Sequence, residues 1–381
     1  MKKSISFTIL VSLLILVLLT STSCDKIFNT TSGQQTTTTQ GQTTTTTTSQ
    51  TSTTQTTTTT TTTAQAGTWS FLGPSNVDGT DIAISPNDPQ TIYLASNGGG
   101  IYKSTDGGVS WTTKNSTLLN ANICAVAVDP YNSNVVYAAS VEYPIMGLFR
   151  SIDGGDQWST VITDSPVNEV YIDPSNSNIV YAAIHAQGLW KSTDGGNTWA
   201  VTGIASAIVN AVAVDPNNSN IVYAGGENWG DTELGGLFRS TNGGATFQSN
   251  GPYGKLIYCI AIDPSNTNRV YVGAKGPWDI PSSGLWRTND AGVSWQSIAF
   301  GSYEIQSLLI NPSLPNELYA IAITGNREGA MPNAVPYITV DYGMTWREIS
   351  VGLSTTSTLR LVSDGHGEIY LGAYYGVYKL N

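Results

Sequence analysis

This chain of 381 residues has 27 acidic and 16 basic residues, and its formal net charge at pH 7 is −11. Nucleic acid and anionic lipid are poor partners for so acidic a chain, because both are recognised by basic surfaces. The low charged fraction of 11%, together with 39 glycines and 19 tyrosines, is typical of many short strands joined by tight turns and argues against a helical protein.

The first segment in chain order has the pattern of an export signal. Two lysines precede an apolar run over residues 5–19, and small polar residues then lead to Cys24. The run is too short to span a membrane, so residues 1–23 are predicted to be a signal peptide, with Cys24 as the cleavage and lipidation point. Ser21 stands where bacterial lipoprotein signals usually have leucine, so secretion without a lipid is the alternative. A lipid on Cys24 would hold the protein on a membrane surface, at the cell surface or facing the periplasm.

Residues 24–66 form a second segment, which after Asn29 consists almost entirely of Thr, Gln, Ser and Gly. A sequence of this kind has no apolar surface to bury, so it is predicted to be a disordered linker. We interpret it as a passive spacer, and Thr-rich stalks can also be glycosylated.

A motif of eight residues, which we call the octet, then occurs six times. Its first copy, from Ser104 to Trp111, reads S-T-D-G-G-V-S-W. An acidic or amide residue followed by glycine predicts a tight turn between two strands, with the aromatic residue on the second strand. The acidic position recurs every 41 to 51 residues, at Asp106, Asp153, Asp194, Asn242, Asp290 and Asp341. A repeat of this period is typical of β-propeller blades.

Each period has room for four short strands. After an octet come an apolar strand ending in Asp-Pro, a polar turn, a Val-Tyr-Ala strand, a loop, and a Leu-Phe-Arg-Ser strand that leads into the next octet. Seven such units fill residues 67–381, although the last lacks its fourth strand, and the segment from Thr68 to Leu72 resembles the missing one. The sequence therefore predicts an all-β, seven-bladed propeller, in which the N-terminal strand pairs with the last blade and closes the ring.

The repetition of the octets argues for a structural role. One active site does not require six copies of an aspartate, so the six acidic positions are expected to accept backbone hydrogen bonds, while the octet aromatics pack between sheets. The Asp-Pro turns receive the same interpretation, with calcium binding as the alternative, at Asp129, Asp173, Asp215 and Asp263. Cys124 and Cys259 fall in blades that are not neighbours, so they are predicted to be buried free thiols. Neither a metal site nor a cofactor is predicted.

The octets resemble the Asp-box repeat, also called the BNR repeat, Ser-x-Asp-x-Gly-x-x-Trp. The Asp-Pro, Val-Tyr-Ala and Gly-Leu-Trp-Lys-Ser segments are also similar to those of Asp-box propellers, a superfamily that includes xyloglucan-active glycoside hydrolases, sialidases, the sortilin ectodomain and photosystem assembly factors. The resemblance covers residues 67–381 and implies the propeller fold. It leaves the function open, because the superfamily contains enzymes, receptors and assembly factors.

Functional residues are expected where the repeats differ. Loops between the second and third strands are long in blades two, four, five and six, so blades four to six would form one wall around the mouth of the ring. Aromatic rings beside carboxylates and amides are typical of sugar binding, although the two wall tryptophans would, in the alternative, only cover their own loops. The wall candidates are Glu227, Asn228, Trp229, Asp231, Glu233, Trp278, Asp279, Arg327 and Glu328. The candidates on adjoining loops and across the mouth are Tyr253, Tyr303, Glu304, Glu142, Tyr143 and His185.

Two functions of different class follow from this arrangement. The favoured one is a surface-anchored binding module for a glycan or an extracellular protein. The other is a glycoside hydrolase or polysaccharide lyase, because glycoside hydrolysis needs two carboxyl groups roughly 5 to 9.5 Å apart. The weak catalytic candidates for such a pair are Glu227, Asp231, Asp279 and Glu328. An assembly or scaffold role is a weaker third possibility.

The resemblance itself argues against two known activities. Asn97 stands where the xyloglucan hydrolases have a catalytic aspartate, and an amide cannot ionise. The Phe-Arg-Ile-Pro segment of the sialidases is absent, and Arg150, Arg239 and Arg287 occupy repeat positions on third strands, which implies a structural role. Whether the protein is an enzyme is therefore left open, with binding preferred over catalysis.

Overall fold

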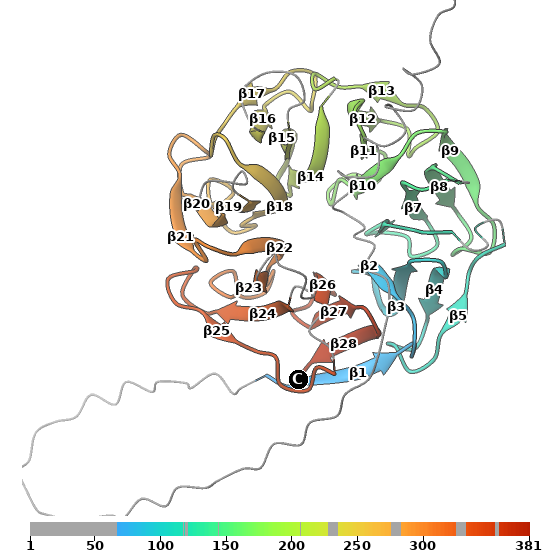
Figure 1. Ribbon diagram of the computed structural model, residues 1–381. Helices are drawn as coiled ribbons and strands as arrows, with labels where there is room; N and C mark the ends of the chain where they lie inside the picture. Colours follow the sequence, from blue (N-terminus) through green and yellow to red (C-terminus); the bar gives the residue numbers. More distant parts are fainter. Residues whose placement is uncertain are drawn as a thin grey trace, which may run out of the picture.

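The computed structural model in Figure 1 shows seven four-stranded antiparallel sheets arranged as blades around a central channel. It describes residues 67–381 except 117, 119–120, 144, 206, 228–234, 276–282, 325–332 and 355–357. The predicted signal peptide, Cys24 and the linker lie outside the described residues. Within the described part of the chain there is no helix, and so none that is long and apolar enough to cross a membrane. The predicted all-β, seven-bladed fold is confirmed.

Every blade has the same order of four strands, from the channel outward. The inner strands are β2 (Gly79–Ser85), β6 (Ala125–Val128), β10 (Val167–Ile172), β14 (Ile208–Asp215), β18 (Leu256–Ile262), β22 (Glu304–Ile310) and β26 (Thr358–Ser363). The second strands are β3 (Asp88–Ser96), β7 (Val136–Ser140), β11 (Val180–Ile184), β15 (Asn218–Glu227), β19 (Val270–Lys275), β23 (Leu318–Thr324) and β27 (Ile369–Ala373). The third strands are β4 (Gly100–Ser104), β8 (Gly147–Ser151), β12 (Gly188–Ser192), β16 (Gly236–Ser240), β20 (Gly284–Thr288), β24 (Asn333–Thr339) and β28 (Gly376–Leu380). The outer strands are β5 (Thr112–Thr113), β9 (Ser159–Thr163), β13 (Ala200–Val201), β17 (Gln248–Ser249), β21 (Gln296–Ala299), β25 (Arg347–Glu348) and β1 (Trp69–Gly73).

The ring closes through the strand nearest the N-terminus. Strand β1 is the outer strand of blade seven, in the sheet order β1-β28-β27-β26, and Trp69 lies opposite Leu380 in an antiparallel ladder. The Trp69 side chain is buried, and its backbone N–H donates to the Val351 carbonyl at 2.9 Å. The predicted closure by the N-terminal strand is therefore confirmed, and strand β28 is paired on both sides.

The core consists of seven apolar clusters, each located between two neighbouring blades. The second strands are buried on both faces, because each sheet is covered by a neighbour on either side, and this explains their continuous Val-Tyr-Ala-Ala sequences. Cys124 and Cys259 are buried and form no disulfide within the described residues, as predicted, and burial raises the pKa of the Cys259 thiol to about 12.

The octets form the turns between third and outer strands, and blade three shows their hydrogen bonds. The Ser192 hydroxyl donates to Asp194 Oδ1 at 2.8 Å and accepts the Gly196 N–H at 2.8 Å. Asp194 also accepts the backbone N–H of Thr198 at 2.8 Å and its hydroxyl at 2.6 Å. The same backbone hydrogen bond occurs in the other octets, so each acidic or amide side chain is held within its own turn.

Basic residues on third strands stack on tyrosines of the second strand in the same blade. The Arg150 guanidinium lies 6.0 Å from the centre of the Tyr137 ring, and Arg239 lies 5.8 Å from that of Tyr223. The Tyr137 hydroxyl in turn donates to the Gly195 carbonyl of the next blade at 2.7 Å. These contacts join adjacent blades and support the structural role predicted for the repeat arginines.

Two faces of the ring differ in their connections. The turn face carries the turns from inner to second strands and the octets. The loop face carries the loops from second to third strands and the connections from outer strands to the next blade. Because the inner strands run from the loop face to the turn face, the first residues of each inner strand lie nearest the loop face.

Six of the seven inner strands contain a register shift near their start. A bulge of this kind changes the direction in which the next side chain points. The residue that follows the shift is Asp81, Glu169, Ala211, Cys259, Ser307 or Arg360, and all six line the central channel. The bulges therefore place six different side chains at one level of the channel.

Candidate functional site

The predicted wall on blades four to six is only partly described. Strand β15 ends at Glu227, of whose side chain the structure gives no account. The other wall candidates lie outside the described residues, namely Asn228, Trp229, Asp231, Glu233, Trp278, Asp279, Arg327 and Glu328. Their roles as ligand-binding or catalytic residues stay predictions.

The described part of the loop face carries several exposed tyrosines. Their side chains come from the second-to-third loops of blades two and seven and from the connections that enter blades five and six. The exposed fractions are 85% for Tyr143, 72% for Tyr253, 40% for Tyr303, 40% for Tyr374 and 47% for Tyr375. Tyr374 and Tyr375 also contact each other edge to face, with ring centres 5.0 Å apart. Exposed rings of this kind offer flat apolar surface next to water.

Acidic residues accompany these rings. The Asn122 amide donates to Glu142, next to Tyr143, and the Asn97 amide donates to Asp78 Oδ2 at 3.2 Å. Burial raises the pKa of the Asp78 carboxyl, and the charge of Asp78 raises the pKa of Tyr374. Blades seven, one and two therefore form a continuous row of tyrosines, amides and carboxylates on the loop face.

Two further predicted residues have described partners. On the far side of the mouth, Lys275 Nζ lies 3.0 Å from Glu304 Oε2, so the predicted Glu304 is held in an ion pair. His185 is partly buried at the end of blade three, where burial lowers the pKa of its imidazole. The backbone N–H of His185 donates to the Pro166 carbonyl at 2.9 Å.

Asn97 is exposed at the tip of blade one, at the position where the resemblance implies an aspartate in hydrolases. Its backbone N–H donates to the Asp78 carbonyl at 2.8 Å, and its amide reaches the Asp78 side chain. Asp78 is therefore a carboxylate adjacent to Asn97, which the sequence analysis did not single out. Within the described part of the chain, no three His, Cys, Asp or Glu residues are arranged to hold a metal ion.

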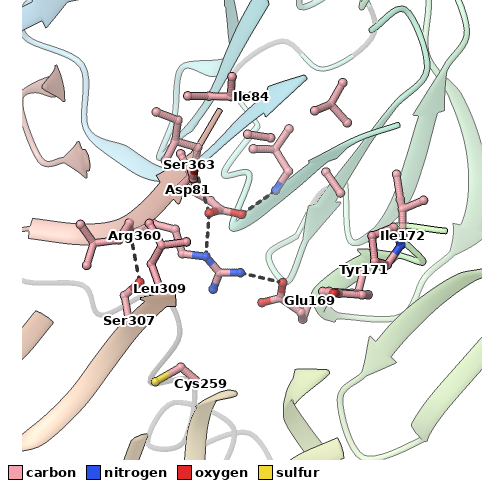
Figure 2. Close-up of a pocket in the computed structure, with 18 of the residues that line it drawn as sticks. Asp81, Ile84, Glu169, Tyr171, Ile172, Cys259, Ser307, Leu309, Arg360 and Ser363 are labelled. Carbon is pink, nitrogen blue, oxygen red and sulfur yellow. Dashed lines mark hydrogen bonds and ion pairs between the residues drawn. The ribbon is translucent and has the colours of Figure 1, made fainter. Parts of the chain in front are cut away.

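A second polar site lies inside the channel (Figure 2). Arg360 Nε lies 3.5 Å from Asp81 Oδ1, and Arg360 Nη2 lies 3.2 Å from Glu169 Oε1. These residues come from blades seven, one and three, so the guanidinium joins three inner strands. Asp81 is further held by the backbone N–H of Val126 in blade two, at 2.9 Å. We call Asp81, Glu169 and Arg360 the channel triad.

The electrostatics of the triad follow from its burial. Burial raises the pKa of Glu169 to about 7, although the Arg360 charge lowers it. Burial also raises the pKa of Asp81, against the opposing effect of Arg360 and of two backbone N–H groups. The pKa of Arg360 is raised because two carboxylates surround it, so this residue stays charged.

The sequence analysis missed the triad, although a signal was present. Three charged residues occupy the same position of otherwise apolar inner strands, in the segments T-D-I-A-I, N-E-V-Y-I and L-R-L-V. A charge in an apolar strand that faces a channel requires a partner. Aligning the seven inner strands would have placed the acids and the arginine at one level.

Comparison by sequence gives no match, neither to a protein-family model nor to a curated protein. Comparison by structure finds similar propellers. The GH74 enzyme of Niastella koreensis matches with a TM-score of 0.63 and 20% identity, over 82% of this chain and 53% of that enzyme. This chain thus spans about half the length of that enzyme.

Two solved structures of other kinds are also similar. YCF48 bound to the D1 peptide matches with a TM-score of 0.59 and 14% identity, over 83% of this chain and 96% of YCF48. The extracellular domain of the one-component system BT4673 from B. thetaiotaomicron matches with a TM-score of 0.59 and 15% identity, over 83% of this chain and 40% of that domain. At these identities the likeness concerns the fold alone. The chain is therefore a seven-bladed β-propeller whose fold is related to the propellers of GH74 enzymes, YCF48 and BT4673.

Proposed function

We propose that this protein is a binding module that recognises a glycan on its loop face. The observation that carries the proposal is the set of exposed tyrosines on that face, Tyr143, Tyr253, Tyr303, Tyr374 and Tyr375. Sugar rings stack their C–H faces on aromatic rings, while their hydroxyls exchange hydrogen bonds with carboxylates and amides. Glu142 with Asn122 and Asp78 with Asn97 supply such groups beside the tyrosines.

The proposal includes the wall predicted from the sequence. Trp229 and Trp278 would add two larger rings on blades four and five, opposite Tyr143 and His185. A ligand that contacts both sides of the mouth would extend over several blades, as expected for a polysaccharide rather than a single sugar. Export and a lipid on Cys24 would place this face outside the cell, and the likeness to the BT4673 extracellular domain is compatible with that location.

Retention on an array of plant, algal and bacterial polysaccharides tests the proposal. We expect the wild-type protein to be retained on at least one polysaccharide, and Trp229→Ala, Trp278→Ala or Tyr143→Ala to lose that retention without a change in melting temperature. Tyr131→Ala is the matched control, because Tyr131 is also an exposed tyrosine, 59% exposed, but lies on the turn face. Wild-type protein that is retained on none of the polysaccharides, while it captures an extracellular protein, would overturn the glycan assignment in favour of a protein ligand.

A hydrolase or lyase is the second candidate, and the likeness to a GH74 enzyme favours it over other chemistries. It requires two of the acids Glu227, Asp231, Asp279 and Glu328 to converge, within the separation that glycoside hydrolysis needs. Release of reducing ends or unsaturated products from the bound polysaccharide, lost in Glu227→Gln or Asp279→Asn, would establish it. Binding without any product would leave the protein a binding module. The third candidate, an assembly or scaffold role, has the likeness to YCF48 as its only support.

A further inference from the structure

The central channel encloses a cavity of about 500 Å³, separate from the loop-face tyrosines. Its walls are apolar residues of the inner strands, such as Ile84, Ile172 and Ile310, and four prolines surround its end at the turn face. Strand rise is about 3.3 Å per residue, so the five steps along the strand from Asp81 to Pro86 give the cavity a length of roughly 16 Å. The cavity is thus long and apolar, and the channel triad lies at its end nearest the loop face.

The triad fills only one side of the channel. At the same level, blades four, five and six contribute the small side chains Ala211, Cys259 and Ser307. Figure 2 shows Ser307 next to Arg360, and Cys259 farther from the guanidinium with its sulfur turned away from it. The free volume at this level therefore lies beside Arg360, opposite the two carboxylates.

Of the three triad side chains, that of Arg360 is the most exposed to the cavity. The Arg360 side chain is 36% exposed, whereas those of Asp81 and Glu169 are 7% and 13% exposed. Nε and Nη2 of Arg360 face the carboxylates, and no described residue accepts a hydrogen bond from Nη1. A guanidinium has five N–H donors and no acceptor, so the open group in the cavity is a cationic donor.

We propose that the channel binds an elongated apolar monocarboxylate, whose carboxylate contacts Arg360 Nη1 and whose tail lies along the inner strands toward the turn face. The volume is within the range of small-molecule sites, which are mostly apolar with a few placed polar groups. The Ser307 hydroxyl accepts the Leu361 N–H at 3.0 Å and so holds the strand of Arg360 in place beside the cavity.

The two triad carboxylates do not prevent the binding of an anion. Burial raises the pKa of Glu169 to about 7, so this carboxyl readily carries a proton and leaves part of the Arg360 charge uncompensated. The other ionisable groups described around Glu169 are Asp81 on β2, Tyr171 on its own strand and Cys259 on β18, and burial raises the pKa of each of these three as well. The guanidinium is more exposed than either triad carboxyl, so it is the charged group that a ligand in the cavity would contact first.

Titration calorimetry of the full chain with decanoate, decanol and decylamine tests the proposal. We expect saturable binding of one decanoate per chain, and at least tenfold weaker binding of the alcohol and the amine. Equal binding of all three probes, or no binding of decanoate, would overturn the proposal.

Two variants locate the site within the channel. Ala211→Leu fills the space beside the guanidinium without removing an ion pair, so it should abolish decanoate binding, whereas Ala200→Leu on the exposed outer strand β13 should not. Unchanged decanoate binding in Ala211→Leu would rule out the channel, and polysaccharide retention on the loop face should be unaffected in either case.

Discussion

The acids of the octets and the acids of the channel triad have the same side-chain chemistry in opposite surroundings. Asp290 is exposed and Asp106 and Asp194 are half-buried, and hydrogen bonds from neighbouring hydroxyl and N–H groups lower the pKa of each to about 2. Asp81 and Glu169 are buried, and desolvation raises the pKa of both despite a nearby arginine. An acid of the first kind occurs in five of the six octets, whereas each member of the second group occurs once.

The difference separates structural from candidate functional carboxylates in a repeat protein. An acid that is fully hydrogen-bonded within its own turn stabilises that turn and has no lone pair positioned for a ligand. An acid that is paired with a residue from another blade keeps its partner only while the ring is closed. Burying such a pair also costs desolvation free energy, which the fold alone does not require. Four predictions use this contrast.

The largest effect is expected from removing the cation of the triad. Arg360→Met leaves two buried carboxylates near each other without a partner, and breaking a buried ion pair in this way costs about 3–5 kcal/mol of unfolding free energy. Urea unfolding measures the loss. Asp81→Asn and Glu169→Gln introduced together with Arg360→Met should restore most of the stability, and a single variant that loses less than about 1 kcal/mol would contradict the account of the triad.

The second effect is a pH dependence. The pKa of Glu169 is raised from 4.5 to about 7 on folding, so between these values the native state binds more protons than the unfolded state. The contribution of Glu169 to stability is then largest below pH 4.5. It falls as the pH rises to 7, by about 3 kcal/mol. Glu169→Gln should flatten the stability profile in this window, and an unchanged slope would mean that Glu169 does not titrate there.

A smaller effect is expected in a single octet. Ser192→Ala removes the hydroxyl that accepts the buried Gly196 N–H and donates to Asp194, so unfolding should become easier by about 1–2 kcal/mol. Ser192→Thr is the matched control, because blades five and six have Thr288 and Thr339 with the same hydrogen bonds. A loss in the threonine variant equal to that in the alanine variant would show that the hydroxyl is not the cause.

The smallest effect on stability is expected on the loop face. Tyr143 is 85% exposed, so Tyr143→Ala should change the unfolding free energy by less than about 0.5 kcal/mol. Its effect should appear only in polysaccharide retention. A clear drop in melting temperature would assign Tyr143 to the fold instead of to the binding face.

The fold could be predicted because its information is local and repeated. Adjacent residues determine the tight turn of each octet, with its glycines and the aromatic residue that follows. Six copies at a nearly fixed period then favour a β-propeller over other all-β architectures. The closing strand was also predictable, since the segment at Trp69 matches what the last blade lacks.

The site was less accessible from the sequence. Glu169 and Arg360 are 191 positions apart and meet only because the ring brings blades three and seven to a common channel. The direction in which these two side chains point also depends on the β-bulges. The location of a bulge follows from the pairing of the strands and not from residue type. Loop length predicts a wall on blades four to six, and this stays a prediction because most of those residues lie outside the described part of the chain.

The pairing of β1 with β28 leaves the two ends of the propeller side by side, with the Asn381 N–H donating to the Thr68 carbonyl at 3.0 Å. A short peptide joining these ends would make the ring continuous. New termini could then be opened in a connection between any two blades, because every blade has equivalent neighbours on both sides. Circularly permuted versions of this protein should therefore fold, and they would allow the loop face to be tethered in different orientations toward its ligand.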